Sequence, residues 1–133
     1  MTTNELHAYV AAHQPLTGRV WSGTQSSYWY NWLHERTFAK LLGGRAVEGS
    51  LNVWFTQEYR FRHPVLIRAK AERWSKLYVQ SVIVSKDGRK FAEGLALRRG
   101  AKDSRAWMEI FAKVRLRKYL KLRDNDLISV WMR

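Results

Sequence analysis

The chain of 133 residues contains no cysteine, so disulfide bonds and thiolate metal sites are excluded. Acidic residues are scarce, because eleven Asp and Glu stand against twenty-four Lys and Arg, which gives a formal net charge of +13. No apolar run approaches the roughly 20 residues that a membrane-spanning helix requires. We therefore expect no membrane association and an anionic partner, either a free nucleotide or a nucleic-acid polymer.

Motifs of several enzyme classes are missing as well. The sequence has no Walker loop, no His-Glu-x-x-His motif and no spacing that suggests a Ser-His-Asp arrangement, so a separate hydrolytic chemistry has no support. The opening stretch MTTNELHAYVAAHQ lacks the basic start and apolar core of a secretory signal. We expect a cytoplasmic protein.

What the sequence does have is a series of short strand patterns. Strands are predicted at 16–21, 47–55, 107–111 and 127–132, with further short strands between residues 59 and 99 and a turn at 86–88. Helices are predicted at 32–42, where Gly43-Gly44 follows, and around 116–120. This pattern predicts a mainly β fold, a small barrel with one or two inserted short helices. We expect residues 16–133 to form its single domain and residues 1–15 to form a short N-terminal helical extension.

One strand begins in an unusual way. In VEGSLNVWF, residues 47–55, apolar residues alternate with Asn52 and Trp54, yet the strand is entered through Gly49 and Ser50. The alternation places the Ser50 hydroxyl and the Asn52 carboxamide on one face. By itself the fragment fits a turn followed by an exposed strand residue. It also fits a pair of hard oxygen ligands for a metal ion.

The order of the pieces resembles one known family. A strand ending in Ser22-Gly23, a helix ending FAKLLGG, the stretch EGSLNV and the C-terminal MEIFAKVRLRKYLKLRDNDLISV resemble, in that order, the archaeal CTP-dependent riboflavin kinases. The resemblance spans residues 16–132. It implies a cradle-loop barrel that uses CTP and Mg²⁺ to phosphorylate riboflavin or another small hydroxylated acceptor.

The resemblance also implies roles for particular residues. Ser50 and Asn52 stand where the family has a Thr and an Asn that hold Mg²⁺. Glu109 matches a carboxylate that orients or deprotonates the acceptor hydroxyl, and Arg117 matches the Arg of a Leu-Arg pair. The family's glycine-rich nucleotide loop corresponds to Ser22, Gly23, Thr24, Gln25, Ser26, Ser27 and Tyr28.

A second hypothesis comes from the departures from that family. Gln25 and Ser27 replace two loop glycines, and the stretch RRGAKDSRAW lacks the Thr and His that touch the flavin in the family. With the charge of +13, the altered loop favours a non-catalytic barrel of the same ancestry that binds nucleic acid through basic faces and exposed aromatic residues. The missing Thr and His leave the acceptor open between riboflavin and another small molecule. Trp21, Trp29 and Trp32 around the loop could stack on a base or a planar acceptor, or could pack the barrel against its helix.

Overall fold

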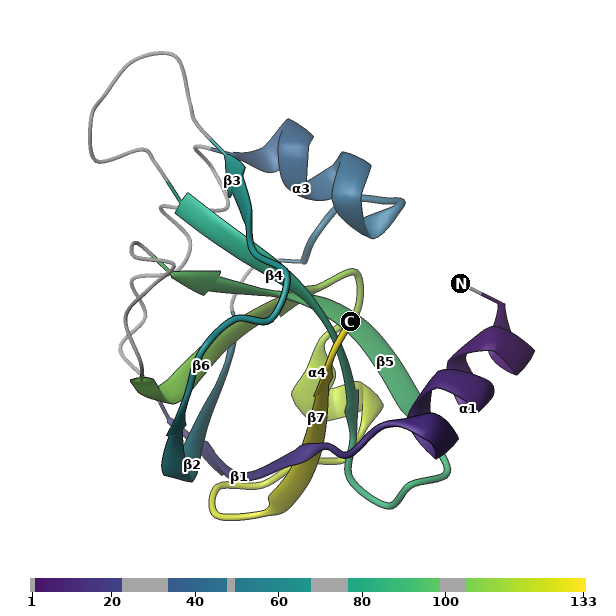
Figure 1. Ribbon diagram of the computed structural model, residues 1–133, viewed down its shortest axis with the longest axis vertical. Helices are drawn as coiled ribbons and strands as arrows, with labels where there is room; N and C mark the ends of the chain where they lie inside the picture. Colours follow the sequence, from purple (N-terminus) through teal and green to yellow (C-terminus); the bar gives the residue numbers. More distant parts are fainter. Residues whose placement is uncertain (1, 23–33, 48–49, 68–76, 99–104) are drawn as a thin grey trace.

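The protein is a small antiparallel β-barrel (Figure 1). The computed structural model describes residues 2–22, 34–47, 50–67, 77–98 and 105–133. The described strands are β1 (Leu16–Trp21), β2 (Leu51–Tyr59), β3 (Val65–Ile67), β4 (Leu77–Ser85), β5 (Phe91–Arg98), β6 (Arg105–Ala112) and β7 (Leu127–Met132). They form one sheet in the order β3-β4-β5-β6-β2-β1-β7, and β7 also pairs with β4. That last pairing closes six strands into a barrel and leaves β3 as an extra strand, so the predicted fold class is confirmed.

Strand β4 makes the closure possible by changing partners along one edge. Its first residues, 77–79, pair with β3, whereas residues 82–85 pair with β7. Its other edge pairs with β5 from Tyr78 to Ser85. The backbone N–H of Arg133 donates to the Ser81 carbonyl at 2.9 Å and so continues the β7 pairing by one residue. After closure, each of the six barrel strands has a hydrogen-bonded neighbour on both sides.

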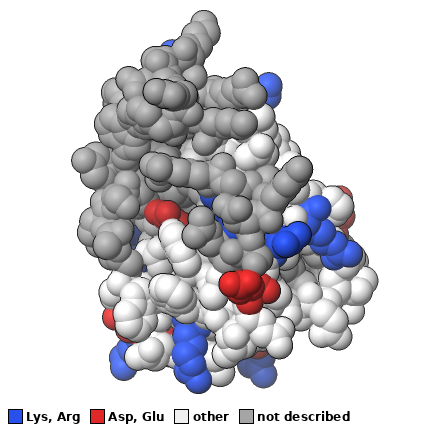
Figure 2. Space-filling view, turned by 60° about the vertical axis from the view of Figure 1, so that its left-hand side comes forward, with Lys and Arg blue, Asp and Glu red and all other residues white. Residues whose placement is uncertain are grey.

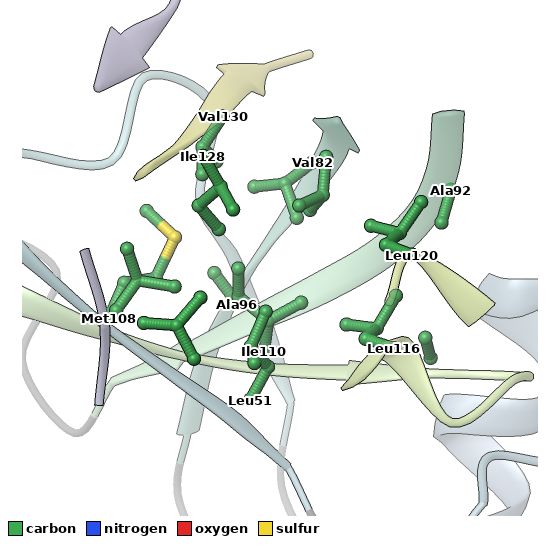
Figure 3. Close-up of a cluster of buried hydrophobic side chains, with 14 of the residues drawn as sticks. Leu51, Val82, Ala92, Ala96, Met108, Ile110, Leu116, Leu120, Ile128 and Val130 are labelled. Carbon is green, nitrogen blue, oxygen red and sulfur yellow. The ribbon is translucent and has the colours of Figure 1, made fainter. Parts of the chain in front are cut away.

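Alternate residues of the strands fill the inside of the barrel. Val20, Val53, Val82, Val84, Met108, Ile110, Ile128 and Val130 are each at most 1% exposed. Leu116, from the single-turn helix α4 (Leu116–Tyr119), and the adjacent Leu120 project into the same cluster (Figure 3). Since Leu51 and Val53 of β2 point inward, the intervening Asn52 points to the outer face.

Helix α3 (Glu35–Leu42) covers part of that outer face. It ends at Gly43, whose φ of +74° suits the left-handed cap, and the Gly43 N–H donates to the Ala39 carbonyl. Phe38 is fully buried, and its ring centroid lies 5.5 Å from that of Phe111. The second apolar cluster of the molecule surrounds these two rings: Ala46, Ile67, Leu77, Val79, Leu95 and Leu97. Residues 32 and 33 of the predicted helix lie outside the described residues.

The N-terminal segment is helical, as predicted for residues 1–15, and it is fastened to the barrel. Helix α1 (Thr3–Ala12) places the Tyr9 hydroxyl 2.6 Å from the Met132 carbonyl, to which it donates. The indole N–H of Trp131 donates to the His13 carbonyl at 3.1 Å. Both contacts attach α1 to β7.

Two predicted elements differ from the observed ones. Strand β2 begins at Leu51, directly after the predicted entry through Gly49 and Ser50, but it runs on to Tyr59, past the predicted end at residue 55. Its register against β6 shifts between Trp54 and Tyr59. The Tyr59 hydroxyl donates to the Trp107 carbonyl at 2.7 Å, which fixes β6 at the shift. Strand β6 begins at residue 105, before the predicted 107. None of the helices in the described part of the chain is both long and apolar enough to span a membrane.

Candidate functional site

Three predicted site residues meet on the outer face of the barrel. Asn52 of β2 lies directly opposite Glu109 of β6 in the strand register. The Ser50 hydroxyl, just before β2, donates to Glu109 Oε1 at 2.9 Å across a sequence separation of 59 residues. All three side chains are half-buried. The proposed metal pair and the proposed catalytic carboxylate therefore form one cluster.

The chemistry of this cluster suits a hard divalent cation. A serine hydroxyl has one proton and two lone pairs, so Ser50 can donate to Glu109 and still present lone pairs to a metal ion. The Asn52 carbonyl oxygen and the Glu109 carboxylate are also oxygen ligands of the kind that Mg²⁺ prefers. In the described parts of the chain, no three His, Asp or Glu residues gather as a metal site. A metal here would be held by the neutral oxygens of Ser50 and Asn52, with the Glu109 carboxylate beside them.

Arg117 reaches the neighbouring strand rather than the cluster itself. Its Nη2 donates to the Trp21 carbonyl at 3.1 Å and to Asp124 Oδ1 at 2.7 Å. The Ser22 hydroxyl donates to Asp124 Oδ2 at 2.6 Å. The Ser22 hydrogen bond and then the Arg117 hydrogen bond hold the pKa of the Asp124 carboxyl below its ordinary value. Trp21 lies opposite Asn52 in the strand register. Arg117 is therefore bonded to β1, the strand next to the one that carries the predicted metal ligand Asn52.

The predicted nucleotide loop begins at this same end of β1. Ser22, its first residue, is exposed and is held by Asp124. The other predicted loop residues lie outside the described residues: Gly23, Thr24, Gln25, Ser26, Ser27 and Tyr28.

Two tryptophans that the sequence analysis did not single out border the cluster. Trp54 follows Asn52 by two residues and Trp107 precedes Glu109 by two, so all four lie on the outer face. Trp54 is 45% exposed and Trp107 is 39% exposed, and their ring centroids lie 6.4 Å apart. The spacing of two along each strand was a visible signal, but the pairing of β2 with β6 was needed to place them together.

In the view of Figure 2, the charges of the described residues do not form one continuous basic patch. Figure 2 shows Lys and Arg side chains in separate groups along the lower edge and on the right-hand side, with Asp and Glu between them. Several of these cations are held by acids, as in the pair Lys86 Nζ to Asp126 Oδ2 at 3.1 Å.

Neither a scan against protein-family models nor a search of curated proteins found a match.

Proposed function

We propose that the protein is a Mg²⁺-requiring phosphotransferase that uses CTP and resembles the archaeal riboflavin kinases. The observation that supports this most is the gathering of Ser50, Asn52 and Glu109 on one face, with Ser50 hydrogen-bonded to Glu109 at 2.9 Å. A binding protein without catalysis has no need of a hydroxyl, a carboxamide and a carboxylate at these register positions. The proposed acceptor is riboflavin or another small hydroxylated molecule, and the proposed location is the cytoplasm.

The residues divide the work of an in-line transfer. Ser50 and Asn52 would hold Mg²⁺, which when bound neutralises charge on the nucleotide phosphates. Glu109 would accept the proton of the acceptor hydroxyl. The acceptor oxygen forms a bond to the terminal phosphorus, the bond from that phosphorus to the bridging oxygen breaks, and the nucleoside diphosphate leaves. The proton passes from Glu109 to solvent.

Two further features fit this assignment. Arg117 and Ser22 both bond to Asp124 at the end of β1. The proposed nucleotide loop therefore starts next to Trp21, the residue of β1 that lies opposite Asn52. Neutral metal ligands such as Ser50 and Asn52 hold a cation weakly without phosphate oxygens. Metal and nucleotide should therefore bind together.

Calorimetric titration tests the proposal. The full chain would be titrated with CTP, ATP and GTP, each with and without Mg²⁺. We expect selective binding of CTP that depends on Mg²⁺. The variant Asn52→Ala should weaken this binding by at least about tenfold, since even the loss of an outer-shell partner of a metal ligand typically costs 10- to 100-fold.

Gln57→Ala is the matched control, because it removes a carboxamide from an exposed position of the same strand. It should bind CTP as the unmodified protein does. Absence of nucleotide binding by the unmodified protein, or equal binding by Asn52→Ala, would overturn the proposal. Addition of riboflavin to the CTP complex, with FMN as the product followed by chromatography, then tests the acceptor.

A further inference from the structure

Three exposed tryptophans and one arginine line adjacent strands of the barrel's outer face. Arg19 of β1 lies opposite Trp54 of β2, which lies opposite Trp107 of β6, so these three residues form one row across three strands. Trp21 lies in the next row, opposite Asn52. We call Arg19, Trp21, Trp54 and Trp107 the tryptophan face.

The exposure of these rings is unusual for tryptophan. Trp21 is 51% exposed, Trp54 45% and Trp107 39%, whereas Trp131, which packs on α1, is only 6% exposed. Tryptophan is highly buried on average, and a group of exposed large apolar side chains marks an interaction surface. The barrel interior is already filled by other residues, so packing of the core does not require the three rings at these positions.

Arg19 and Arg117 add positive charge at the border of the rings. Arg19 Nη1 donates to the Asn125 carbonyl at 2.9 Å, which leaves most of the five donors of the guanidinium available. Arg117 holds the Trp21 carbonyl and is 40% exposed. Flat rings with cations at their border, on a chain of net charge +13, suit a partner that offers both aromatic faces and phosphates.

We infer that the tryptophan face binds single-stranded nucleic acid by stacking of unpaired bases on Trp21, Trp54 and Trp107, with phosphates at Arg19. Single strands are favoured over duplexes because paired bases do not expose their faces to side chains. An acidic protein would match the net charge but not the three rings. This inference goes beyond the proposed kinase activity and does not depend on it.

Fluorescence anisotropy with labelled single-stranded dT12 and U12 tests the inference on the full chain. Stacking on tryptophan contributes about 1–3 kcal/mol per base, so Trp54→Ala and Trp107→Ala should each weaken binding by about 5- to 150-fold. Neither should change the dependence of affinity on salt. Arg19→Ala should reduce the slope of log affinity against log salt concentration by about 0.7, the value for one phosphate contact on a single strand.

Tyr119→Ala is the control, because Tyr119 is a 38% exposed aromatic residue elsewhere on the surface, with Lys90 Nζ 4.0 Å from its ring centroid. It should bind as the unmodified protein does. Trp54→Phe keeps a ring and should retain most of the affinity, which separates loss of stacking from loss of folding.

Three outcomes would overturn the inference. The first is no saturable binding of either oligonucleotide. The second is unchanged affinity in Trp54→Ala and Trp107→Ala, which would indicate attraction by charge alone. The third is self-association of the protein that Trp54→Ala abolishes, with no oligonucleotide binding, which would make the face an interface between copies. Nucleotide and oligonucleotide titrations use different ligands, so this inference and the kinase proposal can each fail alone.

Discussion

The hydrogen bond between Ser50 and Glu109 can be measured by a double-mutant cycle. Ser50→Ala removes the donor, Glu109→Ala removes the acceptor, and the double variant removes both. The cycle cancels the other contacts of each side chain and isolates the interaction between the two. It therefore tests the contact that brings the candidate site together.

The size of the effect follows from the geometry. A hydrogen bond to a charged group contributes about 1.5–3 kcal/mol, and the 2.9 Å contact here joins half-buried side chains, so we expect a value near the lower limit. Ser50→Ala should reduce the free energy of unfolding by about 1–1.5 kcal/mol. For a domain of this size that corresponds to a decrease in Tm of roughly 3–7 °C. The coupling energy between the two sites should be on the order of 1 kcal/mol.

Urea unfolding followed by tryptophan fluorescence and by circular dichroism gives the four free energies. Ser50→Ala combined with Glu93→Ala is the control cycle, because Glu93 lies on β5 and bonds to Arg133 instead. That control should be additive to within about 0.3–0.5 kcal/mol. If the Ser50 and Glu109 variants are also additive within that range, the hydrogen bond contributes nothing and the clustering argument loses its principal contact.

Two further predictions concern the barrel and its charged loop. Gly94→Ala should destabilise the fold by about 1–3 kcal/mol in urea unfolding, because an added Cβ would lie 2.7 Å from Ile110 Cγ2 and 2.8 Å from the Phe111 carbonyl oxygen. In the control Gly44→Ala the added Cβ would meet only the flexible Lys113 side chain, so the loss of stability should be smaller. Equal losses in the two variants would contradict the close approach at Gly94. The Asp124 carboxyl has a lowered pKa in the folded protein, so its contribution to stability is complete above the ordinary value of 3.8 and is lost as the pH falls through the lower folded value. An NMR titration of that carboxyl carbon should give a midpoint below 3.8, and a midpoint at or above 3.8 would show that Ser22 and Arg117 do not hold it.

Local patterns were sufficient to predict β1 and β7, which pair with each other. Strands β1 and β7 run over residues 16–21 and 127–132, as the alternation of apolar residues and the neighbouring turn signals predicted. The turn before β5 was also predicted from local residues, at 86–88. In the structure Asp87 Oδ1 accepts from two following backbone N–H groups, and Gly88 has a φ of +75°. These features depend on residues close together in the sequence.

The features that were missed depend on long-range pairing. Nothing local indicates that β2 shifts register against β6 after Trp54, or that β4 exchanges β3 for β7 along one edge. The same holds for the tryptophan face, which becomes visible only when Trp54 and Trp107 are placed opposite each other. For the candidate site, the sequence identified Ser50, Asn52 and Glu109 separately by resemblance, and the strand register placed them together.

The closure of the barrel by β7 has a consequence for the order of folding. Until residues 127–132 have left the ribosome, β1 and the second half of β4 have no partner on the edges that β7 later occupies. Exposed strand edges pair readily with other chains. Pairings between distant parts of a sequence also slow folding, because the loop entropy must be lost before the contacts form. We therefore expect that a newly made chain is most prone to aggregation just before β7 is added, and that closure of the barrel is a late step in folding.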